Sequence, residues 1–278
     1  MTVDPPFSRK QPSPLFRTSL SFPHPQVLLV TINRPEKLNS LDSIANHELD
    51  AIWTWYDSRT DLRAAIVTGT GRKAFCAGAD LKEWLDLSDR PARLRRDDDG
   101  EEEAEKKERT QTSSRTPLPI LPPSGFGGLS RRVGKKPIIG AINGLAYGGG
   151  MEMVVNLDLV VADAARATFA LPEVKRGVVA AAGALPRLIR TVGRQRAMEM
   201  ALTGRTVGAT EAKEWGLVNC VVENNKDVCK CYGFSSYVNF FFFRAGKITP
   251  ISFFFFFLKD KIGECASQPP SRMESFSD

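Results

Sequence analysis

The sequence contains very little histidine, since only two occur among its 278 residues, His24 and His47. His24 stands between two prolines, and His47 falls within a helical pattern. Serine and cysteine nucleophiles in enzymes usually depend on a histidine base, so a Ser-His or Cys-His mechanism has almost no candidate residues here. The chemistry of this chain is therefore expected to use carboxylates or backbone groups.

Cysteine is also sparse and irregularly placed. The chain has 5 cysteines, an odd number without regular spacing, which argues against a disulfide framework. Reduced thiols in an intracellular compartment are the better interpretation. A metal site at Cys229 and Cys231 is not favoured, and no metal is expected.

Long apolar runs are missing as well. The longest uncharged stretch late in the chain, residues 231–243, is shorter than the roughly 20 apolar residues that span a bilayer. The net charge is +6, but the densest charge run, residues 97–109, begins with acids. Such a distribution is a poor surface for nucleic acid and suits a small anionic ligand. We therefore expect a soluble protein with neither a membrane span nor a nucleic-acid partner.

Apolar runs and helical periodicity alternate along the chain. The run QVLLVTIN at residues 26–33 is typical of a strand, and Arg34-Pro35 ends it. Further strands are expected at residues 64–69, 137–143, 157–162 and 167–170, and helices at residues 42–57, 151–156 and 184–202, the last interrupted near Gly193. This alternation favours an α/β architecture with mostly parallel strands.

The composition, 42% hydrophobic and 25% charged, is that of a globular protein with one main domain. We assign this core domain to residues 26–223. Residues 1–25 are rich in Ser, Pro and basic residues, which favours a disordered leader over a targeting segment. Within the core, residues 88–136 contain a charged run followed by a Pro/Gly-rich stretch, and we expect a mobile segment there.

Two segments place small residues between a strand and a helix. In KAFCAGADLKE, residues 73–83, small side chains leave free N–H groups accessible at a helix start, where an oxyanion would bind. A tight turn without a ligand is the alternative. In IGAINGLAYGGGME, residues 139–152, three glycines each cost a helix about 1 kcal/mol relative to alanine, so close backbone packing or a ligand is needed to explain them. No Gly-Lys-Ser/Thr follows, which excludes a P-loop.

Three segments, CAGADLKE, AINGLAYGGGMEM and FALPEVKRGVV, in this order and at this spacing, resemble the signature of the crotonase (enoyl-CoA hydratase/isomerase) family. The resemblance covers about residues 26–223. It implies an α/β fold of repeated ββα units wound into a spiral, assembled as a homotrimer or a dimer of trimers. It also implies an acyl-CoA thioester as substrate and no separate cofactor, because coenzyme A enters with the substrate.

The resemblance assigns roles to individual residues. The backbone N–H groups of Ala77 and Gly149 match the oxyanion hole for the thioester oxygen, and Glu152 and Glu173 match the two catalytic glutamates of the hydratases. One carboxylate would take a proton from water while the other supplies a proton to the α-carbon. The residues expected to contact substrate are Lys37, Leu38, Asn39, Ala77, Gly78, Ala79, Asp80, Lys82, Gly148 and Gly149. For Lys37 and Lys82, simple solvation is the alternative.

Both glutamates together favour hydration of a 2-enoyl-CoA or the reverse dehydration. The segment LPEVKRGVVAAAG departs from the commoner hydratase pattern. This departure leaves room for a substrate like that of carnitinyl-CoA dehydratase. The alternatives are a catalytically silent acyl-CoA-binding homologue and an enoyl-CoA isomerase. The family suggests mitochondria or peroxisomes, with the cytoplasm also possible, and a place in fatty acid β-oxidation.

Residues 224–278 depart from the family, which would continue with helices. Neither helical nor strand periodicity is evident there, and phenylalanine runs occupy residues 240–243 and 253–257. Phenylalanine codons are rich in T, so our hypothesis is a translated intron or a frameshift. The alternative is a genuine tail that anchors the protein on a partner or membrane surface.

Overall fold

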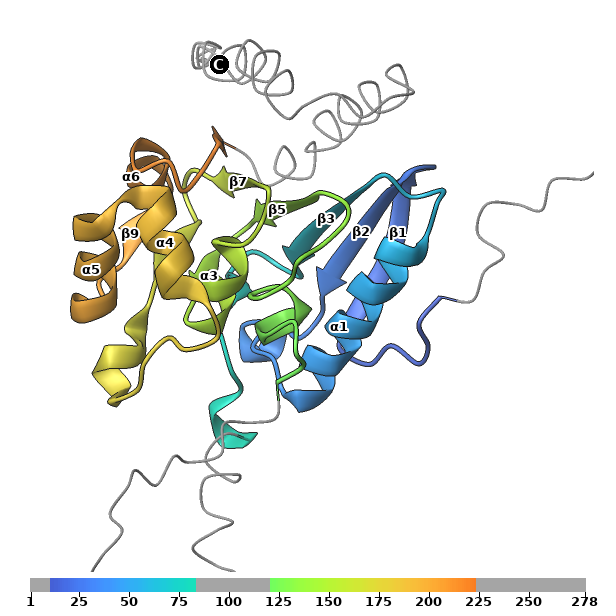
Figure 1. The fold of residues 1–278 in the computed structure, drawn as a ribbon, viewed down its shortest axis with the longest axis horizontal. Coiled ribbons are helices and arrows are strands. Elements are labelled where there is room, and N and C mark those ends of the chain that lie inside the picture. Colours follow the sequence, from blue (N-terminus) through green and yellow to red (C-terminus); the bar gives the residue numbers. More distant parts are fainter. Residues whose placement is uncertain (1–10, 84–120, 224–278) are drawn as a thin grey trace, which may run out of the picture.

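A computed structural model describes residues 11–83 and 121–223 of the chain (Figure 1). The hypothesis for the tail at residues 224–278, and the predictions for residues 1–10 and 84–120, fall outside the described residues. Within the described ranges, no helix is long and apolar enough to cross a membrane.

A six-stranded sheet forms the centre of the fold, with strand order β1-β2-β3-β5-β7-β10. Its strands are β1 (Thr18–His24), β2 (Val27–Ile32), β3 (Ala64–Gly69), β5 (Ile138–Ile142), β7 (Leu159–Asp163) and β10 (Cys220–Val222). All neighbours from β2 onward pair in parallel, whereas β1 pairs antiparallel with β2. The predicted α/β architecture with mostly parallel strands is confirmed. Strands β3, β5 and β7 are buried throughout, as is usual in parallel sheets covered on both faces.

A second sheet of four short strands has the order β4-β6-β8-β9. It contains β4 (Ala74–Cys76), β6 (Leu145–Tyr147), β8 (Thr168–Ala170) and β9 (Val207–Gly208). Each of β4, β6 and β8 directly follows a strand of the large sheet, namely β3, β5 and β7. Successive strand pairs therefore advance along both sheets together, which is the spiral expected for the crotonase fold.

The helices lie outside the sheets. They are α1 (Ser43–Ser58), α3 (Gly149–Val154), α4 (Ala184–Val192), α5 (Arg194–Thr203) and α6 (Ala209–Glu214), with the 3-10 helices η1 (Pro35–Lys37), η2 (Phe126–Gly128) and η3 (Pro172–Arg176). Figure 1 shows α1 beside β1 and β2, while α4, α5 and α6 gather at the opposite end. Gly193 has a φ of 85° and separates α4 from α5, as predicted.

Helix α1 follows from its sequence. Asp42 caps it, with Oδ1 accepting the Ala45 N–H at 2.8 Å. The predicted apolar face is fully buried, including Trp53 and Tyr56. Both of these side chains also satisfy their polar ends, because Trp53 Nε1 donates to the Gly127 carbonyl and the Tyr56 hydroxyl to the Pro137 carbonyl. The helix thereby binds the segment around η2 to the core.

The predicted disordered leader was wrong for residues 18–24, which form β1. Alternate residues of TSLSFPH turn inward, with Thr18 buried and Leu20 and Phe22 packed against the core. The carboxylate of Glu48 on α1 accepts the N–H groups of Phe16 at 2.7 Å and Arg17 at 3.2 Å. These contacts with a distant helix order a segment whose Ser- and Pro-rich composition alone indicates disorder.

Within residues 88–136, the charged run expected to be mobile lies outside the described residues, whereas the Pro/Gly-rich part from residue 121 onward is described and well packed. Phe126 is 4% exposed, and the Gly127 N–H donates to Asn46 Oδ1 at 2.7 Å. The glycines here are used for turns, because Gly125, Gly127 and Gly128 all have positive φ. Their abundance therefore reflects a tightly folded connection packed on α1.

Candidate active site

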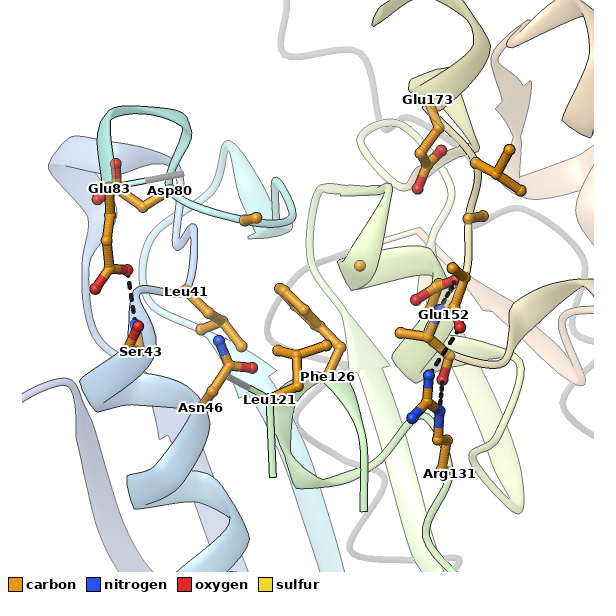
Figure 2. A pocket seen from close by; sticks show the side chains of 16 residues that line it. Leu41, Ser43, Asn46, Asp80, Glu83, Leu121, Phe126, Arg131, Glu152 and Glu173 are labelled. Atoms are coloured by element: carbon orange, nitrogen blue, oxygen red, sulfur yellow. Dashed lines mark hydrogen bonds between the residues drawn. The ribbon is translucent and has the colours of Figure 1, made fainter. Parts of the chain in front are cut away.

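A cavity of about 130 Å³ lies between the start of α1 and the start of α3. Figure 2 shows Glu173, Glu152 and Arg131 along one wall, with Leu41, Ser43 and Asn46 facing them across the space. The residues that line it are Leu41, Ser43, Asn46, Ala79, Asp80, Glu83, Leu121, Phe126, Arg131, Gly149, Glu152, Glu173, Val179, Ala180, Ala181 and Ala182. The structure thus brings together both predicted glutamates and both segments of small residues, 73–83 and 139–152.

The glycines let two backbone segments meet. A Cβ added at Gly78, where φ is 97°, would lie 3.0 Å from the Tyr147 carbonyl oxygen and 3.3 Å from the Gly149 nitrogen. A Cβ added at Gly149 would lie 2.7 Å from ring carbons of Phe126. The close backbone packing predicted from the glycines is therefore present. Gly149 is the first residue of α3, so its N–H is among those that a helix leaves unpaired.

The oxyanion-hole assignment needs a correction at Ala77. The Ala77 N–H donates to the Leu38 carbonyl at 3.0 Å, so it is not available to a ligand, and Ala77 does not line the cavity. Ala79 does line it, and its N–H has no acceptor among the described residues. Gly78 has a left-handed φ and turns the chain between these two alanines. The N–H groups of Ala79 and Gly149 both line the cavity and have no acceptor among the described residues.

The loop that carries Ala79 is held by residues 38–42. Leu41 and Ala79 form an isolated parallel bridge, in which the Leu41 N–H donates to the Gly78 carbonyl and the Asp80 N–H to the Leu41 carbonyl, both at 2.9 Å. Asn39 is 1% exposed, and its side-chain amide donates to the carbonyls of Thr70 and Ala74. Its side chain therefore holds the turn, and the predicted contact of this residue with substrate stays a prediction.

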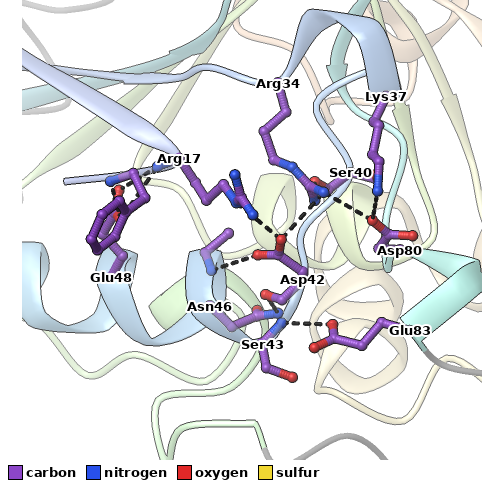
Figure 3. A network of polar contacts seen from close by, with 12 residues as sticks. Arg17, Arg34, Lys37, Ser40, Asp42, Ser43, Asn46, Glu48, Asp80 and Glu83 are labelled. Atoms are coloured by element: carbon purple, nitrogen blue, oxygen red, sulfur yellow. Dashed lines mark hydrogen bonds and ion pairs between the residues drawn. The ribbon is translucent and has the colours of Figure 1, made fainter. Parts of the chain in front are cut away.

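Ion pairs of Asp80 also hold this loop in place (Figure 3). Arg34 Nη2 lies 2.9 Å from Asp80 Oδ2 and 3.2 Å from Asp42 Oδ2, and Lys37 Nζ lies 2.8 Å from Asp80 Oδ2. Burial raises the pKa of Asp80, but hydrogen bonds from Lys37 and Arg34 outweigh it, so the pKa lies below its usual value. Asp80 stays ionised, and Lys37 already has an anionic partner. Leu38 and Lys82 are exposed outside the cavity lining.

Glu152 lies in the first turn of α3 and is 3% exposed. Its Oε1 accepts the Ala182 N–H at 3.0 Å. Burial, and secondarily the charge of Glu173, raise the pKa of Glu152 to about 7, although hydrogen bonds from the backbone at Ala182 and Ala184 and the charge of Arg131 act in the opposite direction. This carboxyl group can therefore both hold and release a proton near neutral pH.

Glu173 follows Pro172 at the start of η3. Its Oε2 is buried without a hydrogen-bond partner among the described residues, and burial raises the pKa of this carboxyl group. A Cβ added at Gly148 would lie only 3.2 Å from Glu173 Oε1. Gly148 therefore provides the space in which this carboxylate sits. A buried oxygen without a partner is rare in folded proteins and marks a position where a bound group is expected.

The sequence did not indicate Phe126, Arg131 and Ala182, which line the cavity, or Ser130, which donates to the Ala182 carbonyl beside it. They lie in a short 3-10 helix or in connections without a periodic sequence pattern, and only packing brings them to the glutamates. No cluster of three or more His, Cys, Asp or Glu side chains that could hold a metal ion occurs in residues 11–83 and 121–223.

Comparison with protein families agrees with this geometry. The chain matches the family model described as Enoyl-CoA hydratase/isomerase over residues 24–108 and 129–230. The chain belongs to the enoyl-CoA hydratase/isomerase family. The family match includes both glutamates and both segments of small residues, 73–83 and 139–152.

Among curated relatives, the chain is 52% identical over 219 residues to a mevalonyl-coenzyme A hydratase of Beauveria bassiana, covering 79% of this chain and 71% of the relative. It is 47% identical to the mevalonyl-coenzyme A hydratase of Aspergillus fumigatus, covering 74% and 67%. Among solved structures, a carnitinyl-CoA dehydratase from Mycobacterium avium matches with a TM-score of 0.64 and 34% identity, covering 80% of this chain and 76% of that one. This likeness establishes the crotonase fold of this enoyl-CoA hydratase/isomerase family member.

Proposed function

We propose that the protein catalyses the reversible addition of water across the 2,3 double bond of a 2-enoyl-CoA. The observation that carries the proposal is a pair of carboxyl groups on the wall of one cavity, the buried Glu152 and the half-buried Glu173 with its buried Oε2, together with the unpaired N–H groups of Ala79 and Gly149. An isomerase needs one group to move a proton between carbons. Hydration needs a second group for the water, and this cavity contains two.

In the proposed hydration, one carboxylate takes a proton from water while the oxygen forms a bond to C3. The electron pair of the double bond moves toward the thioester, and the other glutamate, in its protonated form, donates a proton to C2. One proton enters the glutamate pair and one leaves, so the total number of protons on the two carboxyl groups is unchanged. A pKa of about 7 at Glu152 suits this exchange, because neither protonation state is costly near neutral pH.

The N–H groups of Ala79 and Gly149 are the proposed donors to the thioester oxygen. Negative charge develops on this oxygen as the enolate forms, and preorganised donors stabilise it more than they stabilise the ground state. Removing one such donor costs about 3 to 4 kcal/mol where this has been measured. Coenzyme A enters with the substrate, and the chemistry requires no separate cofactor.

The relatives suggest the substrate to test first. Two of them, 52% and 47% identical, are named mevalonyl-coenzyme A hydratases. Mevalonyl-CoA is a 3-hydroxyacyl thioester, so loss of water from it gives a conjugated 2-enoyl thioester. We propose it as the substrate of this chain in the dehydration direction, with carnitinyl-CoA, named in other relatives, as the second candidate.

The experiment is a spectrophotometric assay with purified protein, following gain of enoyl thioester absorbance from mevalonyl-CoA and its loss from crotonyl-CoA. Glu152→Gln and Glu173→Gln should each lower kcat by about 100-fold or more, since each removes a general acid or base. The control is Glu214→Gln, an exposed glutamate on α6 outside the cavity lining. Tight acyl-CoA binding without turnover in the unmodified protein would contradict the hydratase proposal and favour a silent acyl-CoA-binding protein.

The separate roles of the two glutamates can be assigned by exchange of the C2 proton. Butyryl-CoA has no double bond and cannot be hydrated, but its C2 hydrogen exchanges with deuterium oxide if an enzyme group removes it. The glutamine variant that loses this exchange identifies the glutamate that handles the C2 proton. The variant that retains it identifies the partner that activates water.

A further inference from the structure

Three hydrogen bonds from neighbouring residues converge on one short piece of backbone beside the cavity. Ser130 Oγ donates to the Ala182 carbonyl at 2.7 Å, and Arg131 Nε donates to the same carbonyl at 3.0 Å. Arg131 Nη2 donates to the Ala181 carbonyl at 2.8 Å. We call Ser130 and Arg131 with their three hydrogen bonds the clamp.

The clamped backbone is the one that contacts Glu152. The Ala182 N–H donates to Glu152 Oε1 at 3.0 Å, while the Ala182 carbonyl accepts from the clamp. Residues 178–183 contain no helix or strand, and Gly177 and Gly183 with positive φ stand at the two ends of this stretch. A segment without regular backbone hydrogen bonding needs other contacts to hold one conformation.

Further hydrogen bonds hold the segment that carries the clamp. Ser130 is completely buried, and its hydroxyl oxygen also accepts the Phe126 N–H at 2.8 Å. Asn156, just after α3, donates its side-chain amide to the Leu129 carbonyl at 2.6 Å. The ring of Phe126 packs against Gly149, one of the two proposed oxyanion donors. One connected segment, residues 126–131, therefore contacts both the proposed oxyanion hole and the support of Glu152.

We infer that Ser130 and Arg131 are positioning residues, which hold the Ala182 N–H against Glu152 and so fix the orientation and ionisation of this carboxyl group. Neither needs to touch the reacting atoms for this role. The inference rests on the proposed function only for its kinetic consequence, because the effect on Glu152 is a property of the unliganded protein.

Two charged groups face Glu152, and they act in opposite directions. The negative charge of Glu173 on η3 raises the pKa of Glu152, and the positive charge of Arg131 lowers it. The hydrogen bond from Ala182 also lowers it, since it favours the ionised form. Loss of Arg131 removes the cation and loosens this hydrogen bond, so both changes move the pKa of Glu152 upward.

The test compares Arg131→Met, Arg131→Lys and Ser130→Ala with the control Arg190→Met, an exposed arginine on α4. The first readout is the titration of Glu152 followed by carbon-13 carboxyl NMR in the absence of substrate, with the signal assigned by its loss in Glu152→Gln. Arg131→Met should move this titration to higher pH. Arg131→Lys keeps a positive charge without the two-point geometry, so its titration should move less.

The second readout is the dependence of kcat/KM on pH. In Arg131→Met, the limb that follows Glu152 should move to higher pH, and kcat should fall about tenfold or more with a smaller change in KM, because a small displacement of a catalytic group is costly. In Ser130→Ala, kcat should fall without a change in local charge. Arg190→Met should match the unmodified protein in both readouts.

The outcomes separate the two proposals. An unchanged Glu152 titration in Arg131→Met, with a kcat equal to that of Arg190→Met, would overturn the positioning role. If the unmodified protein turns over no enoyl-CoA, the proposed function fails, while the NMR titration still decides the clamp. If Arg131→Met does not fold, Arg131→Lys and Ser130→Ala decide, and equality of both with the unmodified protein refutes the inference.

Discussion

Ionisation of Glu152 should lower the free energy of unfolding of the protein near and above neutral pH. The side chain is buried, and in the folded protein its pKa is about 7, compared with 4.5 as its ordinary value. Burial is the largest cause, followed by the negative charge of Glu173. Ionising Glu152 in the folded state is therefore costly, and replacing it with a neutral residue of the same shape should relieve that cost.

The sign follows from proton uptake. Between pH 4.5 and about 7 the folded state holds a proton on Glu152 that the unfolded state has released. The contribution of this group to stability therefore falls as the pH rises through that interval, and it is constant above and below it. Because one pKa unit corresponds to about 1.4 kcal/mol, the full loss above neutrality is about 3 kcal/mol.

The assay is urea unfolding of the unmodified protein and Glu152→Gln at about pH 5 and about pH 8. Glutamine can still accept the Ala182 N–H, so the substitution removes mainly the charge. The stability advantage of the variant over the unmodified protein should be about 2.5 kcal/mol greater at the higher pH than at the lower pH, because about 1 kcal/mol of the loss has already occurred at pH 5. Glu214→Gln, at an exposed position, should change neither value. A difference between variant and unmodified protein that is the same at both pH values would refute the reasoning.

Three further predictions follow from the loops that flank the cavity. A Cβ added at Gly149 would lie 2.7 Å from an aromatic ring, so Gly149→Val should lower kcat by about 100-fold or more by displacing an oxyanion donor, whereas Gly208→Ala, with no atom within 4 Å of the added Cβ, should leave kcat unchanged. Asp80→Asn removes one of the two anionic partners of the buried Arg34, which keeps Asp42, and should lower the free energy of urea unfolding by about 2 kcal/mol. Lys37→Met, which removes the more exposed partner of the same carboxylate, should cost less than about 1 kcal/mol, and an equal loss in both variants would contradict this distinction. The homotrimer or dimer of trimers stays a prediction, and light scattering after size-exclusion chromatography would contradict it by giving the mass of a monomer.

The sequence alone determined most of the elements of the large sheet and the helix α1. Buried parallel strands are continuous apolar runs, and the i, i+3, i+4 pattern places the apolar face of α1 without knowledge of its partners. Both strand-to-helix turns of the cavity were also visible, because consecutive small residues are costly unless the backbone needs the space. Strands β4, β6 and β9 have only two or three residues, too few to show an alternating pattern.

Contacts between distant segments decided the rest. The strand β1 became ordered through pairing with β2 and through Glu48, and the Pro/Gly-rich connection around Phe126 through packing on α1. Neither partner is recognisable from local composition, because the stabilising groups lie on other elements.

The same reason explains the correction at the oxyanion hole. The motif CAGAD predicts that small residues approach a ligand there, but it does not say which N–H is free. Only the tertiary structure shows that the Ala77 N–H is taken by the Leu38 carbonyl and that Gly78 turns the chain before Ala79. Likewise, Ser130 reaches Ala182 across 52 residues of sequence. The sequence therefore determined which groups are candidates for the proposed chemistry. Their hydrogen-bond partners, and hence which of them are free to bind a ligand, depended on the folded chain.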